Sequence, residues 1–246
     1  MRATILGSGG PLGMPVPMCD CDYCETGPQR LRAGLIVETE EATLVFDISP
    51  DIRQQLIQTG KEEVDAFFPT HAHFDHFGGF PDLNNLKKFT ESEIQVYGSE
   101  AVQEYINEVF SWTDVDFEVI DERKEIGDLK VEVFMVEHND YLPMQGFSIT
   151  KDDKKVVYIP DLKSLDPSDK YKDADILFVD GMYLFDEHVE NEDHASGSEL
   201  KNEIEKVGAD RVVLLGNSEH FNQMTLQEEK EETEYQLGED FEKFEV

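Results

Sequence analysis

Basic residues are scarce in this chain: 21 Lys and Arg stand against 55 Asp and Glu over 246 residues, which leaves a net charge of −34. Affinity for phosphate backbones and anionic lipids depends on Lys and Arg, so the composition argues against nucleic acid and membrane surfaces as partners. In molar salt the Debye length is only ~3 Å, and the acidic surface then neither unfolds the protein nor repels a small anionic substrate. We interpret the acidity as a halophilic adaptation to a salt-rich cytoplasm, with an ordinary acidic protein as the alternative.

Long apolar runs and abundant cysteines are also missing. No apolar stretch reaches about 18 residues, and the apolar run in "MRATILGSGGPLG" is too short for a signal sequence, so we expect a cytoplasmic protein. The three cysteines all lie in "CDCDYC", as Cys19, Cys21 and Cys24. An odd number packed so closely in a reducing compartment indicates metal ligands and not disulfides. The alternative is a set of three buried free thiols.

Enough apolar material is present for a buried core. Hydrophobic residues make up 39% of the chain, and no repeat, linker or shift of composition divides it, so we expect one domain over residues 1–246. Apolar, β-branched runs predict strands near 2–9, 31–49, 64–70, 94–98, 129–139, 147–161, 174–183 and 211–217. Capped amphipathic segments predict helices at 49–60, 80–89, 99–112 and 196–208. Residues 227–246 fit either a solvated acidic tail or a docked segment.

Two runs of strands, each followed by helices, predict an α/β protein. The expected arrangement is an αββα sandwich, in which two mixed β-sheets face each other and helices flank them. Polar residues at the ends of the strands would then converge at one edge of the sandwich.

Three of the seven histidines lie together in "FPTHAHFDHFGGF" (residues 68–80). His71 and His73 fall on the same side of an extended turn, and Asp75 and His76 follow where a helix would start. This geometry suits two neighbouring metal ions of the Zn²⁺, Mn²⁺ or Fe²⁺ type. Two such ions lower the pKa of a water between them and hold a hydroxide nucleophile at neutral pH. Three surface histidines in a loop are the alternative interpretation.

The segment from Thr70 to Gly79 reads T-H-x-H-x-D-H-x-x-G, and through it the chain resembles the metallo-β-lactamase superfamily over essentially its full length. The resemblance implies further ligands beyond the cluster: His138 in "VEHND" and a bridging aspartate, Asp161, in "VVYIPDLKS". It also implies that Asp75 takes part in catalysis as well as in metal binding.

Within that superfamily, "LGSGGPLGMPVPMCDCDYC" resembles the group of the phosphoribosyl 1,2-cyclic phosphate phosphodiesterase. The resemblance implies a structural zinc on the loop of residues 15–30. Its ligands would be Cys19, Cys21, Cys24 and the distant His220 in "GNSEHF", a sound tetrahedral zinc set.

The same group carries a histidine that assists the leaving group. His194 in "ENEDHASGSEL" is the candidate general acid, and His188 is its competitor. Asp180 in "FVDG" and Asp47 in "FDIS" would orient ligands through hydrogen bonds.

One position departs from the family pattern. The resemblance predicts a histidine on the second metal where the chain has Asn217, a weaker and neutral oxygen ligand. Either Asp75, His76, Asp161 and Asn217 hold the second ion more loosely, or His220 turns into that site and the cysteines take a different fourth ligand.

The resemblance favours a metal-dependent hydrolase, a phosphodiesterase that opens a small cyclic phosphate ester with a metal-bound hydroxide. The expected cofactors are a structural zinc and one or two catalytic zinc or manganese ions, and a homodimer is implied. The alternatives are a cofactor-biosynthesis protein similar to the pyrroloquinoline quinone pathway member of this fold, and a metal-binding protein without turnover, which Asn217 supports.

Overall fold

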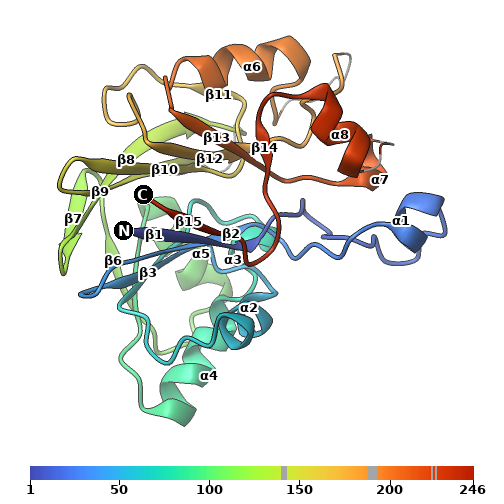
Figure 1. Ribbon diagram of the computed structural model, residues 1–246. Helices are drawn as coiled ribbons and strands as arrows, with labels where there is room; N and C mark the ends of the chain where they lie inside the picture. The colour runs from blue at the N-terminus through green and yellow to red at the C-terminus, as the bar shows by residue number, and fades with distance from the viewer. Residues whose placement is uncertain (140–142, 188–192, 223, 225) are drawn as a thin grey trace.

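Two β-sheets lie face to face in the middle of the molecule, and helices cover their outer sides (Figure 1). The computed structural model describes residues 1–246 except 140–142, 188–192, 223 and 225, and the side chains of residues 221 and 226 are not described either. The order of the layers is helix, sheet, sheet, helix. This confirms the predicted αββα sandwich.

The first sheet has seven strands in the order β15-β1-β2-β3-β4-β5-β6. They are β1 (Arg2–Gly7), β2 (Gly34–Glu38), β3 (Thr43–Phe46), β4 (Ala66–Phe68), β5 (Gln95–Gly98), β6 (Asp116–Val119) and β15 (Lys243–Glu245). Strands β1, β2 and β3 pair antiparallel, and β3 to β6 pair parallel, so the sheet is mixed.

The second sheet has eight strands in the order β11-β8-β9-β10-β12-β13-β14, with β7 also paired to β8. They are β7 (Arg123–Ile126), β8 (Leu129–Glu137), β9 (Met144–Lys151), β10 (Lys154–Ile159), β11 (Ser164–Leu165), β12 (Ile176–Asp180), β13 (Arg211–Leu215) and β14 (Gln236–Leu237). Strands β10, β12, β13 and β14 run parallel. Since β8 and β10 are both antiparallel to β9, they end at the same edge.

The helices confirm the predicted segments near 49–60, 80–89, 99–112 and 196–208, as α2, α4, α5 and α6. The full set is α1 (Asp22–Thr26), α2 (Ile52–Thr59), α3 (Phe74–Phe77), α4 (Phe80–Thr90), α5 (Glu100–Val109), α6 (Gly197–Glu205), α7 (Glu219–Asn222) and α8 (Leu226–Glu232). Ser99 caps the N-terminus of α5, and its hydroxyl accepts a hydrogen bond from Val102 N. In the part of the chain that is described, no helix has the length and apolarity needed to cross a membrane.

The core between the sheets is built on aromatic rings from both of them. Phe46 and Phe68 of the first sheet stack with their centroids 5.2 Å apart, and Phe147 of the second sheet lies 5.4 Å from Phe46. Tyr158 of β10 is also fully buried there. Two further apolar clusters pack the helices onto the outer faces of the sheets. Aromatic pairs of this kind stabilise by about 0.5–1.5 kcal/mol beyond their burial.

The C-terminal segment docks on the sandwich. Strand β15 pairs antiparallel with β1, and Phe244 is buried against Phe178 of the second sheet. Of the two readings of residues 227–246, the docked segment is the one found. The apolar side of β15 therefore outweighs the acidic composition around it.

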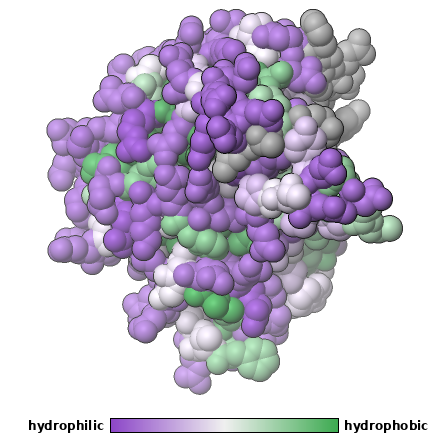
Figure 2. Space-filling view, turned by 45° about the vertical axis from the view of Figure 1, so that its right-hand side comes forward, coloured by the Kyte–Doolittle hydropathy of each residue, from purple (hydrophilic) through white to green (hydrophobic). Residues whose placement is uncertain are grey.

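The exterior is mainly hydrophilic on the face seen in Figure 2, with small apolar groups scattered over it. Among the residues whose side chains are described, the exposed large apolar ones are Leu12, Met18, Ile57, Phe74, Phe89, Val109, Trp112 and Met135. Single exposed apolar residues are normal on protein surfaces.

Candidate metal centre

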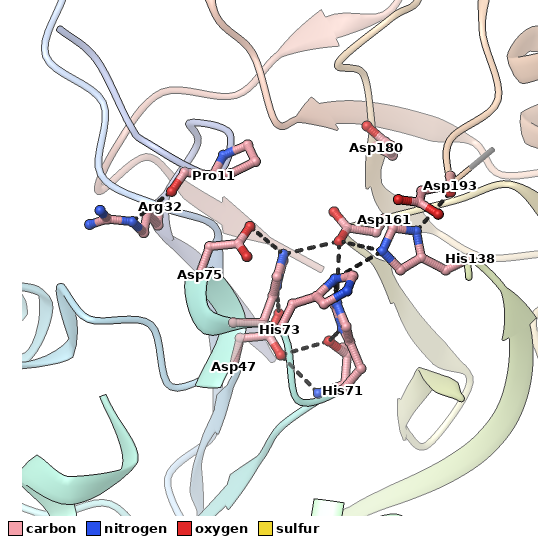
Figure 3. A network of polar contacts seen from close by, with 12 residues as sticks. Pro11, Arg32, Asp47, His71, His73, Asp75, His138, Asp161, Asp180 and Asp193 are labelled. Atoms are coloured by element: carbon pink, nitrogen blue, oxygen red, sulfur yellow. Dashed lines mark hydrogen bonds and ion pairs between the residues drawn. The ribbon is translucent and has the colours of Figure 1, made fainter. Parts of the chain in front are cut away.

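Strand ends from both sheets meet at one edge of the sandwich and bring the polar clusters of the sequence together. Asp47 follows β3, His71 follows β4, His138 follows β8 and Asp161 follows β10, while Asp180 is the last residue of β12. Parallel strands end at a common edge, and this is where ligands bind in sheets of this kind. Figure 3 shows these side chains pointing toward one another.

The first half of the cluster is rich in nitrogen. One ligand atom each of His71, His73, His138 and Asp161 lies within 4.8 Å of the others. His73 Nδ1 is 2.8 Å from His71 Nε2 and 3.2 Å from His138 Nε2. Asp161 Oδ2 is 3.5 Å from His71 Nε2 and 3.4 Å from His138 Nε2. Three imidazole nitrogens and a carboxylate oxygen thus converge on one point.

The second half adjoins the first through Asp161. His76 Nε2 is 3.2 Å from Asp75 Oδ2 and 3.2 Å from Asp161 Oδ2. Asp75 and His76 are in place because α3 begins directly after His73 and turns both side chains toward the sheet edge. The Asp161 carboxylate therefore lies between the two halves.

The outer nitrogens of three of these imidazoles have acceptors on the chain. The contacts are His71 Nδ1 to Thr70 Oγ1 at 2.9 Å, His76 Nδ1 to Asp47 Oδ2 at 2.7 Å and His138 Nδ1 to the Asp193 carbonyl at 2.7 Å. Thr70 Oγ1 donates its own proton to Asp47, so it accepts from His71. When these imidazoles are neutral, the outer nitrogens carry the proton and the inner ones carry the lone pairs. This is the state in which imidazole binds a metal, and the donor set fits one.

His73 is turned the other way, with Nδ1 inside the cluster and Nε2 outside. Its Nε2 lies 3.2 Å from the side-chain amide nitrogen of Asn139. The nitrogen and oxygen of an amide exchange places on rotation, and only the oxygen accepts a proton from Nε2. We predict that a rotated Asn139 amide accepts this hydrogen bond and orients His73. Sequence reasoning missed it, although its place beside His138 at a strand end was a usable signal.

Charge in the cluster favours a cation. Burial raises the pKa of Asp161, but the nearby His76 outweighs this and holds that pKa well below its usual range. Burial lowers the pKa of His71 well below normal and keeps that imidazole neutral. For His76 the effect of burial is outweighed by Asp161 and Asp75, which raise its pKa well above normal. A metal ion bound beside these ionised carboxylates would take the place of the proton that they otherwise hold on His76.

His194 lies at the rim of the cluster and is held by Asp180. His194 Nδ1 is 2.6 Å from Asp180 Oδ2, and the His194 ring is 4.8 Å from the His138 ring. Asp180 also accepts hydrogen bonds from the backbone nitrogens of Leu162 and Met182, so its position is well defined. Burial by itself lowers the pKa of His194, but Asp180 outweighs it and raises the pKa to about 9. His188, the competing candidate, lies outside the described residues.

Asn217 follows β13 and is fully buried. Its backbone nitrogen donates to Ser8 O, and its amide nitrogen donates to Leu214 O at 2.7 Å. Its Oδ1 is buried without a hydrogen-bond partner among the described residues. A buried amide oxygen in this state is a candidate donor to a metal or ligand.

The cysteine loop forms a second cluster, around His220. The Sγ atoms of Cys19, Cys21 and Cys24 each lie 3.5 Å from His220 Nδ1. Of the two arrangements that the sequence left open, the structure has the one in which His220 faces the cysteines. Hydrogen bonds from Cys24 and His220 lower the pKa of Cys21 to about 6, whereas burial raises that of Cys24 to about 11. Three thiols and one imidazole fit tetrahedral zinc.

A buried ion pair anchors the helix that carries His220. Arg30 Nη2 lies 3.1 Å from Glu219 Oε1, and the same guanidinium donates to Ser8 Oγ and to Gly238 O. It thereby joins the cysteine loop, α7, the first turn and the C-terminal segment. Sequence reasoning missed this pair, because 189 residues separate its members and no local pattern relates them.

Comparison with known proteins identifies the class. Residues 42–216 match the beta-lactamase superfamily domain, which is most of the chain, and the protein belongs to this superfamily.

The particular relatives include several activities. An octanoyltransferase of Porphyromonas gingivalis is 29% identical over 245 residues, which cover 89% of this chain and 46% of the relative. Ribonuclease Z of Methanosarcina mazei is 26% identical over 163 residues, which cover 61% of this chain and 48% of the relative. The chain thus spans about half the length of the curated relatives it matches.

The solved structures that match the whole chain include two that are informative here. A diphosphatase of the PhnP family has a TM-score of 0.85 at 25% identity and covers 100% of this chain and 97% of its own. Zinc-bound PqqB of Methylobacterium extorquens has a TM-score of 0.80 at 19% identity, with 100% of both chains covered. The resemblance to the PhnP-like group is confirmed by the first, and the second shows the shared fold.

The contact between Asn139 and His73 predicts two opposite substitutions. Asn139→Leu removes the acceptor for His73 Nε2 and should weaken metal binding by roughly 10–100-fold. Asn139→Asp keeps an acceptor of similar size and should retain the affinity. Competition with a chromogenic chelator measures both. Equal losses in the two variants would rule out the orienting role.

The cysteine cluster predicts a loss that is mainly structural. Cys21→Ser should remove one zinc per chain and lower the melting temperature, by roughly 2–4 °C for each kcal/mol lost in a chain of this size. Turnover per folded molecule should change less. Calorimetry and elemental analysis test this, and a loss of turnover at unchanged melting temperature would contradict it.

Proposed function

We propose that the protein is a metal-dependent phosphoric diester hydrolase that acts on a small phosphorylated substrate, with a cyclic phosphate ester as the best fit. The observation that carries the proposal is the cluster of His71, His73, His76 and His138 around Asp161, with His194 at its rim. The PhnP-family diphosphatase supports it, because that relative also acts on phosphate and covers the whole chain.

We assign the metals by donor type. The catalytic ions, zinc or manganese, would be held by His71, His73, His138, Asp161, Asp75, His76 and Asn217. A structural zinc would be held by Cys19, Cys21, Cys24 and His220. Metal ions in such a site supply Lewis acidity toward the phosphoryl oxygens and lower the pKa of water.

The protein groups then have distinct tasks. Asp75 Oδ2 lies on the second half of the cluster, where it orients the attacking water and takes a proton from it. His194, protonated and held by Asp180, donates a proton to the leaving oxygen. The buried contacts of Asp47 and Thr70 keep the imidazoles in one orientation throughout.

Charge limits the substrate class. With a net charge of −34 the surface offers no basic footprint for a nucleic acid, so we propose a small substrate although ribonucleases are among the relatives. A reducing cytoplasm, which would keep the three cysteines available as thiolates, belongs to the same proposal. We also propose that the protein forms a homodimer.

The alternative functions would use the same metal sites but predict different reactions. A cofactor-biosynthesis protein akin to PqqB and a metal-binding protein without turnover both predict no hydrolysis of phosphodiesters. The name of the octanoyltransferase relative adds acyl chemistry as a third outcome, so an octanoyl thioester belongs in the assay.

The first test is hydrolysis of bis(p-nitrophenyl) phosphate in high-salt buffer, with and without added Mn²⁺ or Zn²⁺. We expect metal-dependent turnover that falls by at least roughly 10²-fold in Asp75→Asn. Protein treated with chelator is the matched control. Hydrolysis of the thioester without hydrolysis of the phosphodiester would replace the proposal with an acyl-transfer function.

The pKa of His194 predicts the alkaline limit of the reaction. A general acid works while it is protonated, so the rate with a poor alkyl leaving group should fall as the pH rises through about 9. Asp180→Asn removes the charge that raises this pKa and should move the limit to lower pH. His194→Gln should cost roughly 10²–10⁴-fold with the alkyl ester and much less with p-nitrophenolate, which needs no proton. An equal loss for both esters would exclude the role.

A further inference from the structure

We propose that the two halves of the active-site cluster take different metals: zinc in the half formed by His71, His73 and His138, and an exchangeable, oxygen-preferring ion, Mn²⁺ or Mg²⁺, in the half formed by Asp75 and His76. The inference rests on the proposed function to the extent that both halves bind metal. It adds which ion each half selects.

The donors of the first half favour zinc. Three imidazole nitrogens, His71 Nε2, His73 Nδ1 and His138 Nε2, face one point, with distances of 2.8 and 3.2 Å from His73 to the other two. Two of these side chains are at most 1% exposed, which limits exchange with solvent. Imidazole-rich sites suit zinc, and burial slows its loss.

The second half has a different composition. Its single nitrogen, His76 Nε2, lies 3.2 Å from one oxygen each of Asp75 and Asp161. Asn217, the remaining predicted ligand, adds no nitrogen, because its amide nitrogen is already bound to Leu214 O and only Oδ1 is without a partner. Carboxylate, carbonyl and water ligands suit magnesium and manganese.

The negative charge around the second half also favours a hard, oxygen-preferring cation. The carboxylates of Asp47, Asp75 and Asp161 each lie within 3.2 Å of a nitrogen of the His76 imidazole. Arg32, which lies beside Asp75 in Figure 3, donates its hydrogen bonds to Asp51 and to the Pro11 carbonyl. The Asp75 side chain is 18% exposed, so water reaches this half. Such a site holds a hard cation through charge and keeps water ligands.

Zinc binds more strongly than manganese at most sites, so selection depends on supply as well as on donors. The advantage of zinc is largest where nitrogen donors dominate. When free zinc is buffered to a low level and manganese is abundant, the nitrogen-rich half and the cysteine site should keep zinc while the oxygen-rich half fills with manganese.

The experiment equilibrates the whole protein in high-salt buffer with zinc buffered by nitrilotriacetate and an excess of MnCl₂. Elemental analysis and the electron paramagnetic resonance of Mn²⁺ then give each metal per chain. We expect about two zinc and one manganese. His76→Ala should lose the manganese and keep both zinc ions, and His73→Ala should lose one zinc and keep the manganese.

The His76→Ala variant is also a control, because it leaves the acidic surface unchanged. Manganese that is only loosely bound at the surface should therefore remain in this variant. Asp75→Asn serves as a second variant should His76→Ala not fold, as judged by circular dichroism. Three zinc ions without manganese, or manganese retained in His76→Ala, would overturn the proposal. Turnover is measured on the same samples: the expected metals without hydrolysis would refute the proposed function alone, and hydrolysis with three zinc ions would refute this inference alone.

Discussion

The carboxylate of Asp47 is the point on which the two sheets and the cluster depend. It is fully buried and accepts hydrogen bonds from Thr70 N and Oγ1, from His76 Nδ1 and from the hydroxyl of Tyr158. These partners come from the loop after β4, from α3 and from β10 of the other sheet. A buried carboxylate is stable only when it is fully paired, so the sandwich has to close correctly for this residue to be satisfied.

The same hydrogen-bond network determines which imidazole nitrogens face the cluster. Asp47 and Thr70 accept hydrogen bonds from the outer ring nitrogens of His76 and His71. In the neutral imidazoles the lone pairs therefore face the cluster. Asp180 acts similarly on His194, but there the outcome is a charged imidazole that carries a proton to the rim. One device, a carboxylate behind a histidine, therefore serves metal binding at one place and acid catalysis at another.

The cysteine site stabilises the same edge of the sandwich, through the segment that follows β13. His220 and Asn217 belong to one short segment after β13, and Arg30 binds Glu219 between them. Filling the cysteine site therefore holds the segment that also carries Asn217. Stability and metal selection are thus linked through a few residues of covalent chain.

Much of the site was predictable because its residues are close in sequence. "HAHFDH" and "CDCDYC" present their donors within a few residues, and strand and helix periodicity placed them at element ends. The pairings of Asn139 with His73 and of Arg30 with Glu219 were not predicted, although the place of Asn139 beside His138 was a usable signal, and the sequence left the docking of the C-terminal segment open. Each depends on segments that only packing brings together, and a single sequence does not record which distant polar groups will be buried as partners.

The sequence by itself determined the kinds of donor, imidazole, carboxylate and thiolate, and the αββα order of elements, because side-chain chemistry and hydrophobic period are local properties. The tertiary structure decided between the two places that the sequence left open for His220, and it alone decided which nitrogen of each histidine faces inward. Those choices follow from how two sheets bury their polar edge, since each buried donor must find an acceptor, and for His76 and His138 that acceptor lies far away along the chain.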